Sequence, residues 1–291
     1  MTSVQQGTLR VPGASLFYRS CGRSAPLLVL AGGDADMTDP LRDALAHQHR
    51  VITYDRRGWS RSVIDPGGPA PGIGVHADDA CRLLAELADE PALVFGSGLG
   101  ALVGLDLLAR HPDQVRMLVA HEASTPQLLD EEDAAALRAA QQAVIEAFRQ
   151  GGVAAAARLA GELAGLDPED REPDVPLPAP GAREAANTRV LLSSDLPQAA
   201  AYRIDLPALD IQARKLTPAA GRSSRRGPLH ACAAALAEIL ERPLAEFPGG
   251  HTGWLLRPRA FADKLSDVFD GTDRPDWRLT DGAAPRPERR P

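Results

Sequence analysis

The chain has 291 residues, of which 44% are hydrophobic and 24% charged. These values are typical of a globular protein that buries a core without help from disulfides or metals. Its formal net charge of −7 argues against a nucleic-acid-binding protein, because such a protein normally presents a basic face. The three cysteines (Cys21, Cys81 and Cys232) form no CxxC pair, so we expect neither a disulfide framework nor a zinc site, and no cofactor.

The N-terminal segment lacks the basic and apolar regions of a signal peptide. No apolar run reaches the ~18 residues that a membrane-spanning helix needs. We therefore expect a cytoplasmic protein whose partner is a small-molecule substrate, with no nucleic acid and no membrane. The sequence leaves open whether the protein forms a homodimer.

The first part of the chain predicts strands that alternate with helices. A hairpin is expected at 7–20, and short apolar runs predict strands at 26–31, 51–54, 92–95 and 115–120. Helical patterns lie between these runs, at 38–47, 75–89 and 101–112. Strands that are continuously apolar indicate a parallel sheet covered by helices on both faces, which is an α/β fold.

The pattern changes at 123–205, where the sequence predicts only helices and a Pro-rich acidic connector. Such an all-helical interruption predicts a lid over the carboxyl ends of the strands. Strand signals return at 213–220, where Pro218 predicts a bulged or short strand, and at 243–248. The expected organisation is therefore a core of residues 1–122 and 206–270, a helical lid of 123–205, and a disordered tail of 271–291.

Five motifs in a fixed order resemble the α/β-hydrolase superfamily. They are LAGG (30–33), YDRRGWSRS (54–62), FGSGLG (95–100), ARHP (109–112) and FPGGH (247–251). The resemblance implies a mainly parallel sheet flanked by helices, with a helical lid. A fold alone does not fix the chemistry, which depends on the individual site residues.

The position of the family's nucleophile holds a glycine. In the G-x-S-x-G elbow the nucleophile occupies the middle position, which here is Gly98. Ser97 lies one position too early, where a side chain normally points away from the site. Without a nucleophile at residue 98, the family's acyl-enzyme route is closed. We expect Gly98→Ser to restore this route only in part, because the usual acid also looks altered.

The resemblance assigns the other two triad positions to Ser223 and His251. Alignment on the preceding Ala-Ala-Gly puts Ser223 where the acid is expected, so the usual carboxylate is replaced. His251 stands where the family has its general base, and an imidazole exchanges protons near neutral pH. Glu122, which follows the strand at 115–120, is either a substitute acid or a contact at the hinge of the lid.

Backbone N–H groups remain in place when side chains are replaced, so the resemblance also implies an oxyanion hole. Its donors map to the N–H groups of Leu99 and Gly33, next to the positive end of a helix. Asp34, Tyr202 and Trp254 are candidates for lining the substrate pocket, although a solvated loop carboxylate is the favoured interpretation of Asp34.

Three functions fit these residues. The first is an atypical enzyme that uses His251 and an oxyanion hole for cyclisation, isomerisation, elimination or C–C bond chemistry on a small organic molecule. A secondary metabolite is an example that the resemblance suggests. The second is a slow hydrolase of an ester, lactone or similar bond, which uses His251-activated water or Ser97. The third is a non-catalytic protein that keeps the pocket for ligand binding.

Overall fold

The computed structural model describes residues 3–68, 71–176 and 182–271. The tail predicted at 271–291 lies outside these ranges, apart from Gly271. None of the helices in the described ranges combines the length and the hydropathy needed to cross a membrane.

The strands of the described residues form one sheet in the order β1-β2-β4-β3-β6-β7-β8-β9, and β5 pairs with β2. Their bounds are β1 (Gln5–Val11), β2 (Ala14–Cys21), β3 (Pro26–Leu30), β4 (Arg50–Tyr54), β5 (Val63–Ile64), β6 (Ala92–Ser97), β7 (Val115–His121), β8 (Leu216–Gly221) and β9 (Ala245–Phe247). Strand β2 pairs antiparallel with β1, β4 and β5. The neighbours in the order β4-β3-β6-β7-β8-β9 all pair parallel. This confirms the predicted α/β fold with a mainly parallel sheet.

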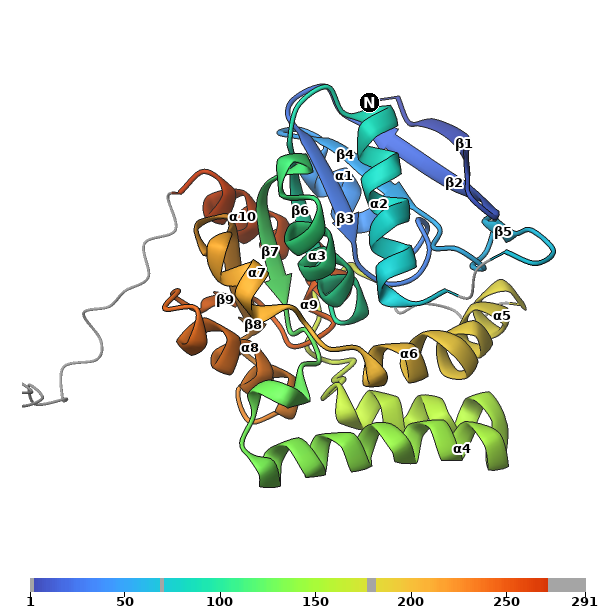
Figure 1. Cartoon of the computed structure of the whole chain (residues 1–291), viewed down its shortest axis with the longest axis vertical. Coiled ribbons are helices and arrows are strands. Elements are labelled where there is room, and N and C mark those ends of the chain that lie inside the picture. The colour runs from blue at the N-terminus through green and yellow to red at the C-terminus, as the bar shows by residue number, and fades with distance from the viewer. Residues whose placement is uncertain (1–2, 69–70, 177–181, 272–291) are drawn as a thin grey trace, which may run out of the picture.

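Helices cover both faces of the sheet, as Figure 1 shows. One apolar core packs α2 and α3 against the sheet, and a second core packs α1 and α10 against the other face. The covering helices and short turns are α1 (Asp39–Leu45), α2 (Ile73–Leu87), α3 (Leu99–Arg110), η1 (Pro112–Gln114), η2 (Pro126–Leu128), α7 (Leu206–Ile211), η4 (Ala213–Lys215), α8 (Pro228–Ile239), α9 (Gly253–Leu256) and α10 (Pro258–Phe269). The continuous burial of β3 and β6 follows from this double cover.

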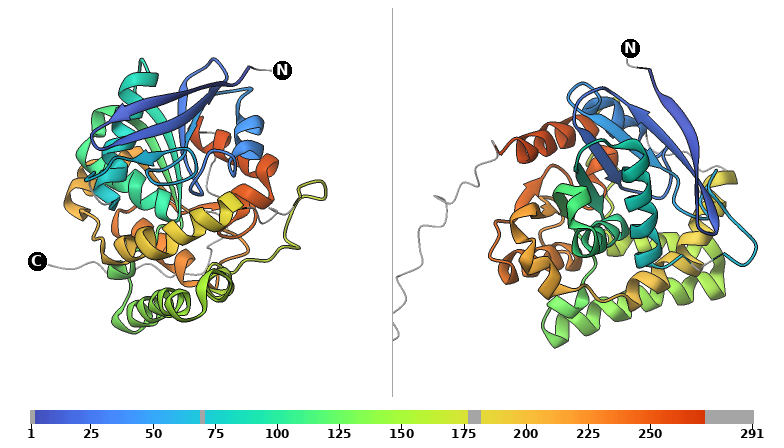
Figure 2. Two further views of the ribbon diagram at one scale, coloured as in Figure 1. Left: turned by 90° about the vertical axis from the view of Figure 1, so that its right-hand side faces the viewer. Right: turned by 45° about the horizontal axis from the view of Figure 1, so that its top comes forward.

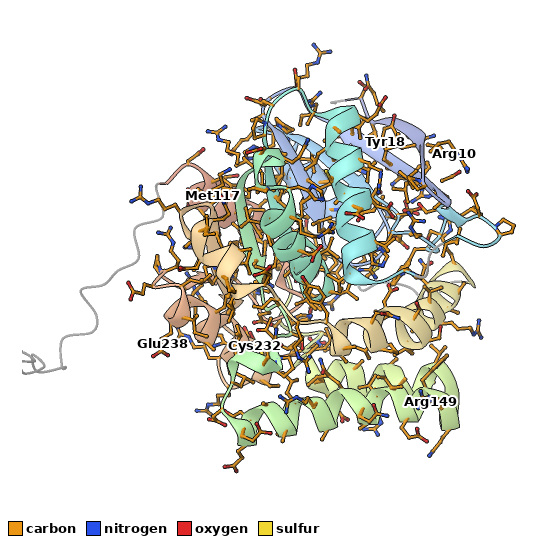
Figure 3. All side chains as sticks on the ribbon, viewed as in Figure 1. Arg10, Tyr18, Met117, Arg149, Cys232 and Glu238 are labelled. Carbon is orange, nitrogen blue, oxygen red and sulfur yellow. The ribbon has the colours of Figure 1, made fainter. Side chains whose placement is uncertain are left out.

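Between β7 and β8 the described chain forms only helical segments, and the four from α4 to α6 make up an insert. These insert helices are α4 (Glu131–Leu163), α5 (Ala182–Val190), the π-helical turn η3 (Leu191–Asp195) and α6 (Leu196–Ala201). Figures 1 and 2 show α4 and α6 beyond the carboxyl end of β7, with polar side chains such as Arg149 on the outer side of α4 (Figure 3). The all-helical character of this stretch agrees with the sequence pattern, and its role as a lid stays a prediction.

Helix α4 is broken at Gly152. Its backbone there has φ 72° and ψ −163°, far from helical values, so the chain reverses between two helical halves. Glycine reaches a positive φ without the steric penalty that a Cβ atom brings. Both halves lie on the outer side of α6, away from the sheet (Figures 1 and 2).

The bulge expected at Pro218 is absent. Strand β8 has six residues, and its register with β7 runs without a shift from Leu216 to Ala219. The pairing of β8 with β9 begins at Ala219, one residue after Pro218. The proline therefore precedes the stretch that has a strand on each side, and the prediction of a bulged or short strand was wrong.

Candidate functional site

A sharp turn joins β6 to α3 at Gly98. Strand β6 ends at Ser97 and α3 begins at Leu99, so one residue makes the whole connection. Gly98 has φ 57° and ψ −117°, a conformation that is strained for any residue with a Cβ atom. At Gly100, a Cβ atom would lie 1.5 Å from the carbonyl oxygen of Leu30, so only glycine lets α3 pack this closely on the sheet.

His251 lies directly above this turn. It follows β9 through the residues Pro248–Gly250 and precedes α9, and about 20% of its side chain is exposed. A Cβ atom added to Gly98 would lie 3.1 Å from both Cε1 and Nε2 of His251. The Nε2 edge of the imidazole therefore faces the position where the family carries its nucleophile.

Glu122 holds the other edge of the imidazole. Its Oε2 lies 2.9 Å from Nδ1 of His251, and the carboxylate is completely buried. Glu122 follows β7 with φ 48°, and its backbone N–H donates to the carbonyl of Ala219 in β8. Its Oε1 accepts hydrogen bonds from the backbone N–H of Gly221 and from the hydroxyl of Ser224. The structure thus places Glu122 against the imidazole and ties it to the end of β8.

These contacts determine the charge of Glu122. Burial alone would raise its pKa, but the hydrogen bond from His251, the charges of His121 and His251, and the Ser224 hydroxyl lower its pKa to about 2. An ionised carboxylate accepts a hydrogen bond from Nδ1–H of His251. The lone pair is then on Nε2, which points toward Gly98 and is free to accept a proton.

Ser223, at the position expected for the acid, does not contact His251. Its hydroxyl donates to Oδ2 of Asp170 at 2.6 Å, and Asp170 also accepts from Nε of Arg257 at 2.6 Å. The neighbouring Ser224 is the serine that reaches the Glu122 carboxylate. The carboxylate that contacts the imidazole is therefore Glu122, next to the end of β7, and not a residue at position 223.

Ser97 lies in the interior of the sheet and not in the site. It is buried at the end of β6, and its Oγ lies 3.1 Å from Nδ1 of His121. His121 is completely buried, and burial lowers its pKa to about 4, so the ring is neutral at neutral pH. The geometry gives no support to the prediction that Ser97 acts as a nucleophile.

His121 is not among the residues predicted for the site. Its ring is stacked on that of His251, with centroids 6.3 Å apart and 28° between the planes. The available signal was a histidine next to Glu122 at the end of an apolar strand, which ordinarily indicates a core residue.

Gly98 and His251 open into a cavity of about 180 Å³ between the sheet edge and the insert helices. Most of its lining is apolar, and the polar side chains among the lining residues are Glu122, Ser124, Gln141 and His251. Leu99 also lines it, and α3 begins at this residue, so the N–H is one of the four that lack a partner within the helix. The remaining lining residues are Gly98, Leu102, Val144, Ala160, Leu163, Ala164, Leu191, Leu192, Leu196, Ala199 and Leu229.

The second predicted oxyanion donor lies elsewhere. Gly33 lines a separate, much smaller cavity together with Arg56, and the ring of Trp59 lies against its α-carbon. Its carbonyl accepts the backbone N–H of Arg56. Leu99 thus lines the cavity of His251 and Gly33 does not, and the role of both as oxyanion donors stays a prediction.

The three residues predicted to line the pocket lie outside the cavity of His251 and make their contacts elsewhere in the fold. Asp34 is neither solvated nor in the cavity, because it is buried and accepts hydrogen bonds from Asn187 at 2.6 Å and Ser60 at 3.1 Å. Tyr202 donates its hydroxyl to Asp106 at 2.6 Å. Trp254 is buried in the apolar core beside Gly32. None of the three is among the residues that line the cavity of His251.

A metal centre was not expected from the sequence. Among residues 3–68, 71–176 and 182–271, no group of three or more His, Cys, Asp or Glu side chains is arranged to hold a metal ion.

Comparison with known proteins gives a consistent picture. The family model of the α/β hydrolase fold matches residues 26–215. The uncharacterised hydrolase YraK of Bacillus subtilis is 35% identical over 275 residues, which cover 92% of this chain and 97% of YraK. A protein of Azorhizobium caulinodans, provisionally named the carbamate hydrolase RutD, is 37% identical over 107 residues, or 36% of this chain and 40% of its own. The esterase EaEST of Exiguobacterium antarcticum superposes with a TM-score of 0.65 at 17% identity, covering 89% of this chain and 97% of the esterase.

Proposed function

This chain belongs to the α/β-hydrolase fold family, and on that basis we propose that it is a hydrolase in which His251 and Glu122 activate a water molecule directly. The observation that carries the proposal is the position of His251. Its Nε2 faces Gly98, its Nδ1 is bound by a buried carboxylate, and both edges adjoin one cavity.

In the proposed first step, Nε2 of His251 removes a proton from a water molecule held above Gly98. The resulting hydroxide attacks the carbonyl carbon of a small substrate in the cavity. Glu122 keeps its negative charge and stabilises the imidazolium that forms. The absence of a side chain at residue 98 supports this route, since it leaves the reacting position to water.

In the second step the tetrahedral oxyanion accepts a hydrogen bond from the N–H of Leu99, beside the positive end of α3. The carbon–leaving-group bond then breaks, and the imidazolium returns its proton to the leaving group. Acid and alcohol or amine leave, and His251 is neutral again. Direct attack by water lacks the advantage of a held covalent nucleophile, so we expect slow turnover.

A second candidate uses the same base without water as reactant. His251 would remove a proton from carbon, and the Leu99 N–H would stabilise the enolate, giving isomerisation, elimination or cyclisation. The glycine at residue 98 favours this chemistry as much as water activation. The hydrolase names of the relatives favour hydrolysis, although carbamate and ester chemistry in those names does not select one substrate class.

The test uses small neutral probes: 4-nitrophenyl acetate, δ-valerolactone and phenyl carbamate. For hydrolysis in H₂¹⁸O, we expect one ¹⁸O atom in the acid product and, by mass spectrometry of rapidly quenched enzyme, no acyl adduct. In a parallel reaction in D₂O, a deuteron incorporated at carbon, with no ¹⁸O uptake in the first experiment, would instead identify the isomerase or elimination chemistry.

Two variants test the roles of the pair. His251→Ala should lower kcat by about 10²–10⁴-fold, the range for loss of a general base, and Glu122→Gln should also lower it while both proteins stay folded. Turnover that survives His251→Ala would contradict the proposal. Ligand binding without any turnover in the unaltered protein would favour the third, non-catalytic hypothesis.

A further inference from the structure

One polar side chain interrupts the apolar inner face of α4. Gln141 lies on the same buried face as Ala134, Leu137 and Val144, and it is only 3% exposed. Its Nε2 donates to Oγ of Ser124 at 2.7 Å, and both residues line the cavity that holds His251. Within the described part of the chain, the Oε1 atom of Gln141 is buried and has no hydrogen-bond partner.

A buried amide oxygen without a partner costs free energy that a leucine at the same position would not cost. The fold therefore uses the amide nitrogen of Gln141, which is bonded to Ser124, but leaves its amide oxygen unpaired. Buried polar groups that stability does not require are characteristic of binding sites, where a ligand supplies the missing partner.

The Gln141–Ser124 pair presents both kinds of hydrogen-bonding group. Because Nε2 of Gln141 donates to Ser124, Oε1 of Gln141 remains as an acceptor and the Ser124 hydroxyl proton remains as a donor. Turning the amide by 180° exchanges these roles but still leaves one donor and one acceptor. The complementary ligand group is one that also donates and accepts at neighbouring atoms.

Charge and size restrict the ligand further. Glu122 is ionised, and no Lys or Arg is among the lining residues of the described chain, so an anionic ligand is disfavoured. The volume of about 180 Å³ is slightly larger than a cavity of roughly 150 Å³ that binds benzene. The cavity therefore suits a neutral group of about the size of a six-membered ring.

We propose that Gln141 and Ser124 recognise a neutral amide-type group, in which an N–H is next to a C=O as in an amide, lactam or carbamate. The N–H of that group donates to Gln141, and its carbonyl accepts from Ser124. The inference rests on the proposed function insofar as the cavity is the substrate site, and it names the substrate class that this site selects.

The experiment measures equilibrium binding and needs no turnover. Two ligands of matched shape, δ-valerolactam and cyclohexanone, are titrated into the protein by NMR, and they differ by N–H in place of CH₂. The variants are Gln141→Leu and Ser124→Ala. The matched control is Gln150→Leu, because Gln150 lies on the same helix but is exposed and bound to Glu146.

We expect Gln141→Leu to lower the ratio of lactam to ketone affinity by about 5- to 10-fold, the effect of one neutral hydrogen bond. Ser124→Ala should lower the ratio in the same direction, and Gln150→Leu should leave it unchanged. The melting temperature of Gln141→Leu should stay close to that of the unaltered protein, because the variant loses the hydrogen bond to Ser124 but also removes a buried oxygen without a partner.

An unchanged ratio in both Gln141→Leu and Ser124→Ala would overturn the inference, and Ser124→Ala decides the matter if the leucine variant does not fold. A different outcome would contradict the catalytic proposal alone. A lactam preference that persists while His251→Ala retains turnover would contradict the catalytic role of His251 and leave the recognition site standing.

Discussion

Nε2 of His251 lies 3.1 Å from the point where a Cβ atom of residue 98 would stand. A serine hydroxyl at residue 98 would therefore lie within hydrogen-bonding reach of an imidazole whose other nitrogen is bound by Glu122. This relationship decides what a serine at residue 98 would do.

We predict that Gly98→Ser becomes labelled by a fluorophosphonate probe and forms an acyl-enzyme with 4-nitrophenyl acetate, whereas the unaltered protein does neither. Partial activity of Gly98→Ser was expected because the acid partner of His251 looked altered. Glu122 contacts Nδ1 of His251, so this reason no longer applies. The new Cβ requires His251 to shift by a few tenths of an ångström. The control is Gly98→Ala, which has the same backbone strain of about 1–3 kcal/mol without the hydroxyl. Equal labelling of both variants would contradict the prediction.

Ser97→Ala should leave turnover within about threefold, because the Ser97 hydroxyl contacts His121 and not the cavity. Loss of its buried hydrogen bond should lower the free energy of unfolding by about 1 kcal/mol. Steady-state kinetics and urea unfolding measure the two effects. A large loss of kcat without a loss of stability would show that Ser97 takes part in the chemistry.

His121 makes the stability depend on pH. Burial lowers its folded-state pKa to about 4, below the ordinary value of 6.5, so between these values the unfolded chain binds more protons than the folded one. Its contribution to stability is therefore present above pH 6.5 and is lost as the pH falls toward 4. We expect this loss to reach up to about 3 kcal/mol, measured by urea unfolding.

The matched variant is His121→Phe, whose ring fits among Phe95, Phe247 and Phe261 and does not titrate. The difference between the two pH curves isolates the histidine from the carboxylates that titrate in the same range. Parallel curves for the two proteins between pH 6.5 and 4 would show that His121 does not carry the effect.

Asp195 anchors the insert helices to the core. It is buried at the end of η3, where it accepts from Arg56 at 2.9 Å and from the Trp59 ring N–H at 2.8 Å. Asp195→Ala leaves Arg56 buried without this partner, so we expect a loss of about 3 kcal/mol and faster proteolysis of the insert.

The control for Asp195 is Asp174→Ala. Asp174 also joins the insert to the core, through Arg259, but its ion pair is exposed to solvent. Little change in stability is expected there. A similar effect of the two substitutions would show that burial of the Asp195 contact is not what anchors the insert.

The local sequence pattern predicts the sheet well because each central strand is a short apolar run that ends in a turn. It also identifies His251 and Gly98, since both lie in motifs of fixed spacing. The role of Glu122 depends on the meeting of β7, β8 and the His251 loop, which no local pattern encodes. The hydrogen bonds of Asp34 and Tyr202 likewise involve Asn187 and Asp106, which are distant from them in the chain.

The sequence pattern also could not distinguish the roles of two adjacent serines. Ser223 and Ser224 are adjacent, yet one binds Asp170 of the insert and the other binds Glu122. Gln141 gave no signal because a single glutamine in an amphipathic helix is ordinarily exposed. Its burial depends on the packing of α4 against neighbouring helical segments such as η3 and α6, which are distant in the chain.

Because α4 is broken at Gly152, both of its halves contribute side chains to the cavity, whereas the imidazole and the carboxylate come from other elements. Val144 precedes the break, Leu163 follows it, and both line the cavity, whereas His251 and Glu122 are held by loops of the sheet. Substitutions along either half of α4 can thus alter which molecules fit without moving the imidazole or the carboxylate. Variants of this chain can therefore differ in the molecules they bind while the pair of His251 and Glu122 keeps its place.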